Sequence, residues 1–194
     1  MNEVIAMTKG QIDKNLPPTK LLWVDLEMTG LDLAKDVILE VSVIITDFNF
    51  LKLADYEAVI HQSDDALANM TDWPAQQHKA SGLTERVRQQ GRPEKEVERE
   101  LVALIGEHFG SEPAVLAGNS IHFDRMFIRR WWPEVESLLH YRMLDVSSFK
   151  VLMQGKYDVN FEKKETHRAT ADIEASIAEL KYYLVVLRNG SSNS

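Results

Sequence analysis

Cysteine is absent from this chain of 194 residues. Its absence excludes disulfide bonds, thiolate metal sites and cysteine nucleophiles, and it is compatible with a reducing compartment. Long apolar runs are absent as well. No stretch reaches the roughly 18 residues of a membrane-spanning helix, and residues 1–19 lack the run of about 7 to 15 apolar residues that a signal peptide needs. We therefore expect a cytoplasmic protein in which any metal is held by Asp, Glu or His.

An excess of positive charge is also missing, since the formal net charge is -8. Affinity for a long nucleic acid comes mostly from clustered Lys and Arg side chains, so this balance argues against a protein that coats long nucleic acid. A local group of cations or a bound divalent metal can still reverse the field inside one pocket. The composition is therefore compatible with a short anionic ligand.

The chain does contain enough apolar residues, 44%, for one sizeable core. Alternating or continuous apolar residues predict three early strands that form an antiparallel meander, and two later short strands that alternate with helices. These strands are predicted at 20–30, 36–47, 55–62, 113–118 and 141–146. This order is typical of an α/β fold, a mixed sheet flanked by helices. We expect a single domain over residues 20–188, with a flexible extension before it (1–19) and a disordered tail after it (189–194).

Helices are predicted where a capping residue or a proline precedes an apolar stripe. Their expected starts are Ser63, Pro74, Pro93, either Asn119 or Ser120, the segment after Val146, and Ala169. The stripe that follows Pro93 is Val97, Leu101, Ile105 and His108. The stripe of the last helix, which ends near Leu187, is Ile173, Ile177, Leu180, Leu184 and Leu187.

Two acids interrupt the first predicted strand, in the stretch "WVDLEMTGLD". Positions two apart in a strand point the same way, so Asp25 and Glu27 share a face with Trp23. Two like charges at that spacing repel, and they must share a proton, pair with bases or hold a cation. A position at a sheet edge or a paired surface charge is the alternative, and it is weakened by the apolar residues on both sides.

Further acids stand in similar settings. Asp124 lies one turn into the helix after "AVLAG", and Asp172 lies beside the buried stripe of the last helix. Four acids without matching buried bases, in a chain without cysteine, indicate hard oxygen ligands for Mg²⁺ or Mn²⁺. His167 precedes Asp172 by five residues. Most histidines are structural, but a ring at this junction can reach a water and titrates near neutral pH, as a general base should.

Four motifs, "VDLEMTGLD", "GNSIHFD", "HYRMLDVSS" and "THRATADI", stand in the order and spacing of the oligoribonucleases, within the DEDDh group of 3'-to-5' exonucleases. The resemblance covers about residues 20–187 and implies a ribonuclease H-like, five-stranded sheet. It also implies two divalent ions held by the four acids Asp25, Glu27, Asp124 and Asp172, with His167 as the base. The expected reaction degrades very short single-stranded RNA, especially 5'-phosphorylated dinucleotides, to nucleoside 5'-monophosphates.

The resemblance also implies how the substrate is bound. Leu31 looks like a wedge between two bases, and Trp73 and His78 look like groups that line the pocket, although core packing is the alternative for Trp73. Along the substrate backbone and around its 5'-phosphate, the residues similar to family contacts are Asn119, Ser120, Arg142, Ser147 and Ser148. Tyr141 resembles a tyrosine that the family contributes to catalysis across a homodimer interface. The segment "FKVLMQGKYDVNFEKK" departs from the basic, Trp-containing stretch that other members often have there.

Other functions remain to be distinguished. The same chemistry could trim or proofread longer single-stranded RNA or DNA, in which case the rate would rise with substrate length. A catalytically inactive nucleotide-binding module would lack an acid or the base, and all five positions are filled here. A structural protein with surface acids would not be stabilised by Mg²⁺.

Overall fold

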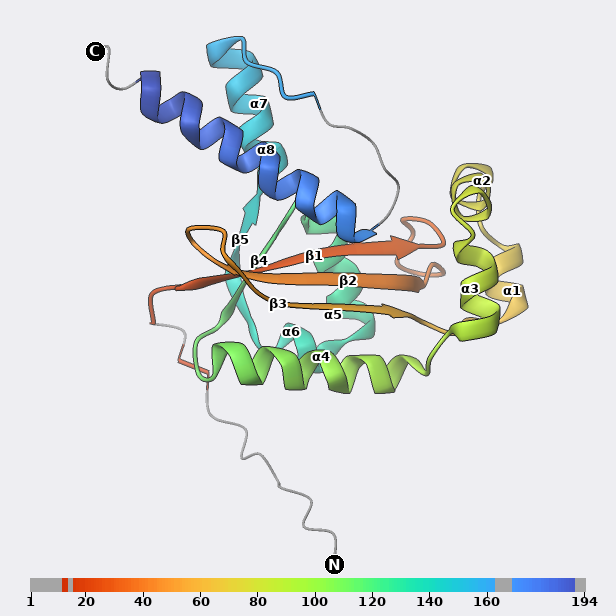
Figure 1. The fold of residues 1–194 in the computed structure, drawn as a ribbon. Helices are drawn as coiled ribbons and strands as arrows, with labels where there is room; N and C mark the ends of the chain where they lie inside the picture. The colour runs from red at the N-terminus through yellow and green to blue at the C-terminus, as the bar shows by residue number, and fades with distance from the viewer. Residues whose placement is uncertain (1–11, 14–15, 163–168, 191–194) are drawn as a thin grey trace, which may run out of the picture.

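The computed structural model describes residues 12–13, 16–162 and 169–190. Five strands form one mixed sheet in the order β3-β2-β1-β4-β5 (Figure 1). The strands are β1 (Lys20–Met28), β2 (Ile38–Asp47), β3 (Lys52–Val59), β4 (Ala114–Gly118) and β5 (Leu139–Asp145). The first three are antiparallel, whereas β4 and β5 join β1 in parallel. The predicted meander and the mixed sheet are confirmed.

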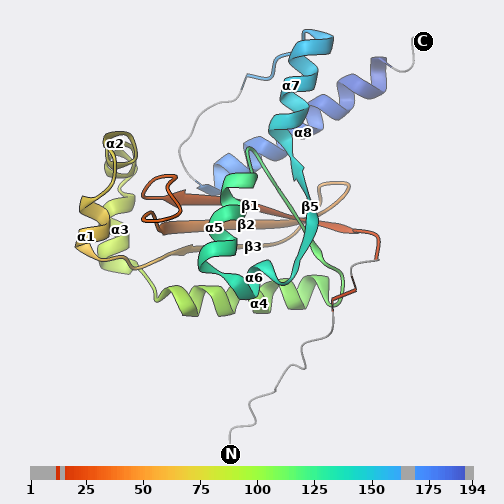
Figure 2. The same ribbon diagram turned by 180° about the vertical axis from the view of Figure 1, so that it is seen from behind.

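Helices cover both faces of this sheet. They are α1 (Asp64–Ala68), α2 (Asp72–Ala80), α3 (Leu83–Gln90), α4 (Glu94–Phe109), α5 (His122–Trp131), α6 (Pro133–Glu136), α7 (Val146–Tyr157) and α8 (Ala169–Gly190). Seen from both sides, α7 and α8 lie across one face, α4 to α6 lie on the other, and α1 to α3 stand together beyond one end of the strands (Figures 1 and 2). Over the described ranges, no helix is both long enough and apolar enough to span a membrane.

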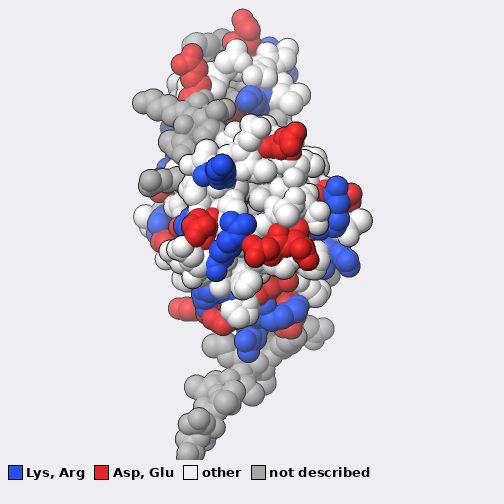
Figure 3. Space-filling model, turned by 90° about the vertical axis from the view of Figure 1, so that its right-hand side faces the viewer, with Lys and Arg blue, Asp and Glu red and all other residues white. Residues whose placement is uncertain are grey.

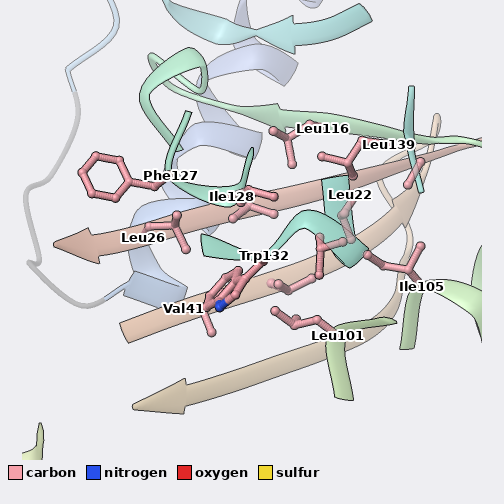
Figure 4. Close-up of a cluster of buried hydrophobic side chains, with 14 of the residues drawn as sticks. Leu22, Leu26, Val41, Leu101, Ile105, Leu116, Phe127, Ile128, Trp132 and Leu139 are labelled. Atoms are coloured by element: carbon pink, nitrogen blue, oxygen red, sulfur yellow. The ribbon is translucent and has the colours of Figure 1, made fainter. Parts of the chain in front are cut away.

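The alternation of β1 builds two cores at once. Leu22, Val24 and Leu26 enter the larger core, where α4, α5 and α6 cover the sheet (Figure 4). Leu21 and Trp23 point the other way, into a core formed with α7 and α8. Asp25 and Glu27 continue this second face, so the helix that begins just before Asp172 covers the same side of the strand as the two acids.

A bulge in β2 gives rise to a third, smaller core. Glu27 pairs with Glu40 but Met28 pairs with Ile38, so Leu39 is the extra residue. It therefore leaves the face of its neighbours and packs against α1 and α3, with Leu67, Leu83 and Val87. We expected Leu39 to share one face with Val37, Val41, Val43 and Ile45. Val37 does pack with Leu39, but Val41, Val43 and Ile45 belong to the larger core, so the prediction is wrong for these three because the bulge shifts the alternation.

Several helix details differ from expectation. Helix α3 has no predicted counterpart, and α2 begins at Asp72, before Pro74. The cap of α5 is Ile121, without a side-chain hydrogen bond. Neither Asn119 nor Ser120 caps this helix, because both are held by groups on α7 and α8 as described below.

Two buried stripes also shift by one position. In α4, Phe109 is buried and His108 only half-buried, because steps of four continue the row from Ile105. In α8, Tyr183 is fully buried while Leu184 is 40% exposed. The Tyr183 hydroxyl donates to Glu179 at 2.8 Å, which allows the ring to be buried without an unsatisfied polar group. Helix α8 continues to Gly190, beyond the expected end at Leu187, and residues 191–194 lie outside the described ranges.

Candidate active site

Acids from two distant parts of the chain meet at one cavity of about 810 Å³. Asp25 and Glu27 reach it from the end of β1, and Asp172 reaches it from the first turn of α8. All three are half-buried. The two β1 acids and Asp172 thus line the same cavity.

Asp124 approaches β1 from α5, which packs on the face of the sheet opposite to α8. The pairing between β1 and β4 ends at Trp23. Asp124 lies in the first turn of α5, the helix that follows β4. Its Oδ1 accepts a hydrogen bond of 2.9 Å from the backbone N–H of Leu26, the residue between the two β1 acids. This is the crevice at the carboxyl ends of adjacent parallel strands where α/β proteins commonly place their ligands.

The carboxyl group of Asp124 is electrostatically unfavourable as an anion in the chain alone. Burial raises the pKa of Asp124 to about 7, and the negative charges of Glu27 and Asp145 add to the rise. The hydrogen bond from Leu26 opposes the rise without cancelling it. An acid in this position gains most from a cation, because a cation removes both the repulsion and the lack of solvation.

The chemistry of the donors fits a hard divalent cation, since they are carboxylates gathered around one crevice. Within the described ranges, no three His, Asp or Glu side chains already converge as a closed metal cage. His167, the expected base, lies outside the described residues.

Residues of α2 and of the loop after β1 also line the cavity. His78 is 4% exposed, its Nε2 lies 2.8 Å from the Met28 carbonyl oxygen, and its Nδ1 lies 3.8 Å from Glu27 Oε2. Burial lowers the pKa of His78, against the effect of the Met28 hydrogen bond, so the neutral ring is favoured. Trp73 is 70% exposed and Leu31 is 58% exposed, and both line the cavity. Core packing, the alternative for Trp73, is wrong.

Asn119 and Ser120 belong to a hydrogen-bond network between the ends of the parallel strands and α8. The Asn119 amide donates to Ser176 (2.8 Å) and to Glu179 (3.2 Å) and accepts from the Ser147 hydroxyl (3.2 Å). Because Glu179 can only accept when ionised, it fixes which end of the amide faces Ser147. The Ser147 hydroxyl is thereby used within the protein, so its predicted contact with a substrate phosphate requires an exchange of partners.

Arg142 and Ser148 line a different cavity, of about 390 Å³, together with Phe48 and Phe149. The described chain alone does not place them in the cavity of the acids. Asp145 connects the two regions, because it lines this second cavity and its charge acts on Asp124. Tyr141 is 64% exposed, and the Arg142 guanidinium lies 4.9 Å from the centre of its ring.

Sequence reasoning missed two acids near the site. Asp145 caps α7 by accepting from the Ser147 N–H at 2.9 Å, and it also accepts from the Ser120 N–H at 3.0 Å. Its signal was the Asp-x-Ser pattern at the end of a strand, which is typical of a helix cap. Asp36 organises the loop that carries Leu31 and has no comparable signal, because its partners depend on the shape of the loop.

The geometry can now be compared with known proteins. Residues 22–180 match a family of exonuclease domains. Among solved structures, a complex of E. coli exonuclease I with single-stranded DNA matches with a TM-score of 0.66 at 16% identity, over 85% of this chain and 40% of that chain. The chain thus spans about two fifths of the length of that protein, and the likeness establishes a shared ribonuclease H-like exonuclease fold.

Relatives in sequence narrow this class. An oligoribonuclease of Corynebacterium glutamicum is 47% identical over 170 residues, which cover 84% of this chain and 78% of the relative. An oligoribonuclease of Shewanella loihica is 44% identical over 169 residues, which cover 85% of this chain and 93% of the relative. The chain belongs to the oligoribonuclease family.

Proposed function

We propose that this chain is a divalent-metal-dependent 3'-to-5' exoribonuclease that degrades very short RNA, including 5'-phosphorylated dinucleotides, to nucleoside 5'-monophosphates in the cytoplasm. The observation that carries the proposal is the shared cavity, which is lined by the acids Asp25, Glu27 and Asp172 and also by the exposed apolar residues Leu31 and Trp73. Acids that bind cations and apolar groups that contact bases are the two components that a nuclease for short strands needs. The names of the relatives support the same activity.

The size of the cavity and the distribution of charge on the surface both agree with a short substrate. The cavity of about 810 Å³ lies within the range of about 300 to 1,000 Å³ that is usual for small-molecule sites. On the face that α1 to α3 occupy, blue and red side chains alternate among the described residues rather than form one basic track (Figure 3). A substrate with few phosphates needs few such contacts.

Asp25, Glu27, Asp124 and Asp172 would hold two ions, Mg²⁺ or Mn²⁺. Such ions, when bound, activate the attacking water and stabilise the leaving 3'-oxygen. Asp124 must give up its proton before it can act as a ligand, because its pKa is about 7 in the chain alone, so cation binding is expected to strengthen as the pH rises. His167 is proposed to accept the proton of the attacking water.

The remaining residues orient the substrate. Leu31 would wedge between the two bases and Trp73 would stack on one of them, while His78 anchors the wall through Met28. Arg142 is suited to a terminal 5'-phosphate because its guanidinium offers a planar pair of donors. We propose that Ser147 and Ser148 complete this phosphate site, and that Asn119 and Ser120 lie along the backbone between the two cavities.

We propose further that two copies of the chain form the working enzyme, with Tyr141 reaching the partner's site. The support is a set of exposed apolar side chains on β5 and α7. Tyr141, Met143, Val151 and Leu152 are between 37% and 71% exposed there. Exposed large apolar side chains are typical of protein interfaces when they form one patch.

The activity is tested with a 5'-phosphorylated diribonucleotide and Mg²⁺. We expect the parent to release mononucleotides and Asp25→Asn to be slower by at least about a hundredfold, since it removes a ligand charge. The matched control is Asp47→Asn, which removes a carboxylate at the end of β2, and this variant should retain the parental rate. No turnover by the parent, or equal turnover by Asp25→Asn, would refute the proposal, and a rate that rises from two to about ten nucleotides would favour an exonuclease for longer strands.

A further inference from the structure

The loop between β1 and β2, which carries Leu31, is closed by a buried carboxylate. Asp36 is 6% exposed, and both of its oxygens are used inside the loop. Oδ1 accepts from the Thr29 hydroxyl at 2.9 Å, and Oδ2 accepts from the Asp32 N–H at 2.8 Å. The acceptors of one side chain thus join the start of the loop to its middle, on either side of Leu31.

The backbone reinforces this closure. The Asp36 N–H donates to the Asp32 carbonyl oxygen at 2.8 Å, and the Val37 N–H donates to the Thr29 hydroxyl oxygen at 3.0 Å. Thr29 is itself buried. Its hydroxyl therefore donates to Asp36 and accepts from Val37, so that both of its hydrogen-bonding roles depend on the loop keeping this shape.

Gly30 is fitted to the same carboxylate. A Cβ atom at Gly30 would lie 2.4 Å from Asp36 Oδ2 and 2.8 Å from Asp36 Cγ, which is closer than real Cβ contacts. The carboxylate cannot easily move away, because both oxygens are held by hydrogen bonds. The side chain of Asp36 therefore fills the space next to Gly30, and the backbone that precedes Leu31 lies directly against it.

This arrangement holds an apolar side chain at the cavity in the absence of substrate. Leu31 is 58% exposed, so burial does not fix its position. A loop that must become ordered during binding weakens binding by the entropy of that ordering, whereas a loop held beforehand does not. The hydrogen bonds of Asp36 provide that order, although Asp36 is not among the residues that line the cavity.

We propose that Asp36 is a positioning residue that holds Leu31 at the height where it separates the bases of a bound dinucleotide. The inference rests on the proposed function, because it assigns Asp36 to the binding of that substrate. Asp36 contributes to substrate affinity through Leu31 and takes no part in the reaction at phosphorus.

The test is a double-mutant cycle on steady-state hydrolysis of a 5'-phosphorylated diribonucleotide. Asp36→Ala should raise KM roughly tenfold, because about one residue of backbone would then have to become ordered on binding. It should change kcat less than about threefold. In a Leu31→Ala background, Asp36→Ala should raise KM no further. Asp36→Asn keeps an acceptor for Asp32 and an amide that Thr29 can accept from, so it should restore most of the parental KM.

Asp47→Ala provides the matched control. Asp47 closes the β2–β3 turn in a similar way, by accepting from the N–H groups of Asn49 (2.8 Å) and Leu51 (2.9 Å), but it lies outside the cavity. It should lower the melting temperature and leave KM unchanged. If Asp36→Ala does not fold, Gly30→Ala serves instead, because the added methyl group would displace the Asp36 carboxylate. Gly30→Ala should then raise KM in the parent and should not raise it further in the Leu31→Ala background.

The possible results separate the two proposals. A parent that does not cleave the dinucleotide contradicts the proposed function. A parent that cleaves, together with a folded Asp36→Ala variant of unchanged KM, contradicts the positioning role alone. An equal rise in KM with and without the Leu31 side chain also overturns it, because Asp36 would then act by another route.

Discussion

Asp124→Asn should make the metal-free protein more stable while it abolishes activity. The ordinary pKa of this carboxyl is 3.8 and burial raises it to about 7, a difference of about 3 pH units or roughly 4 kcal/mol at about 1.36 kcal/mol each. Below about pH 4 the group is neutral in the folded and the unfolded chain, and it costs nothing. Between about pH 4 and 7 the unfolded chain releases this proton more readily, so stability falls as the pH rises, and the full cost remains above pH 7.

We therefore expect Asp124→Asn to raise the free energy of unfolding in EDTA by between about 1 and 4 kcal/mol at pH 8, and by less than half as much at pH 5. The amide oxygen can still accept from Leu26, so the packing is retained. The midpoint of thermal unfolding should rise by several degrees, at about 2 to 4 °C per kcal/mol for a chain of this size. With Mg²⁺ the order should reverse, because the parent gains stability by binding the ion.

Urea unfolding at pH 5 and pH 8, with EDTA or with Mg²⁺, measures both effects. Asp47→Asn is the control with the opposite sign. Backbone hydrogen bonds from Leu51 and Asn49 lower the pKa of Asp47, so the stability that its ionised form contributes is present above its ordinary pKa of 3.8 and is lost as the pH falls. If Asp124→Asn and the parent show the same dependence of stability on pH in EDTA, the assignment of a high pKa to Asp124 is refuted.

Two further predictions concern the substrate. Trp73→Ala should raise KM for a dinucleotide by roughly ten- to a hundredfold, because stacking on an aromatic ring contributes about 1 to 3 kcal/mol per base, and an unchanged KM in steady-state assays would exclude stacking. Arg142→Ala should lower the preference for a 5'-phosphorylated over a 5'-hydroxyl dinucleotide by about tenfold or more, as judged from the two kcat/KM values. Equal losses on both substrates would show that Arg142 does not recognise the phosphate.

The parts of the site that were predictable depend on local geometry. The alternation of a strand places Asp25 and Glu27 on the face of Trp23 wherever the strand lies in the sheet. The position of Asp124 follows from the connection of a buried strand to a helix, since such connections open at the carboxyl end of the sheet. The pattern of apolar residues, which is also local, predicted the five strands of the mixed sheet, and the structure confirms that sheet.

Other parts depend on contacts between segments that are far apart in the chain. The bulge at Leu39 is decided by how β2 meets β1 and α3, and periodicity within β2 carries no trace of it. Asn119 and Ser120 have the composition of helix caps, but α7 and α8 offer them better partners. In the sequence, Asp36 resembles any acidic loop residue. Its role depends on the hydrogen bonds that its oxygens accept from Thr29 and Asp32, and these form only in the folded loop.

The small core that β2 forms with α1 and α3 has a consequence for how this family can diversify. Trp73 and His78 lie on α2, which packs against α3, and α3 in turn packs on Leu39 and its few apolar partners. Asp25 and Glu27 instead lie on β1, which is anchored in the two larger cores. A substitution in the small core can tilt the wall that faces the bases and leave the spacing of the acids intact. Selection could therefore retune the choice of substrate without rebuilding the chemistry of hydrolysis.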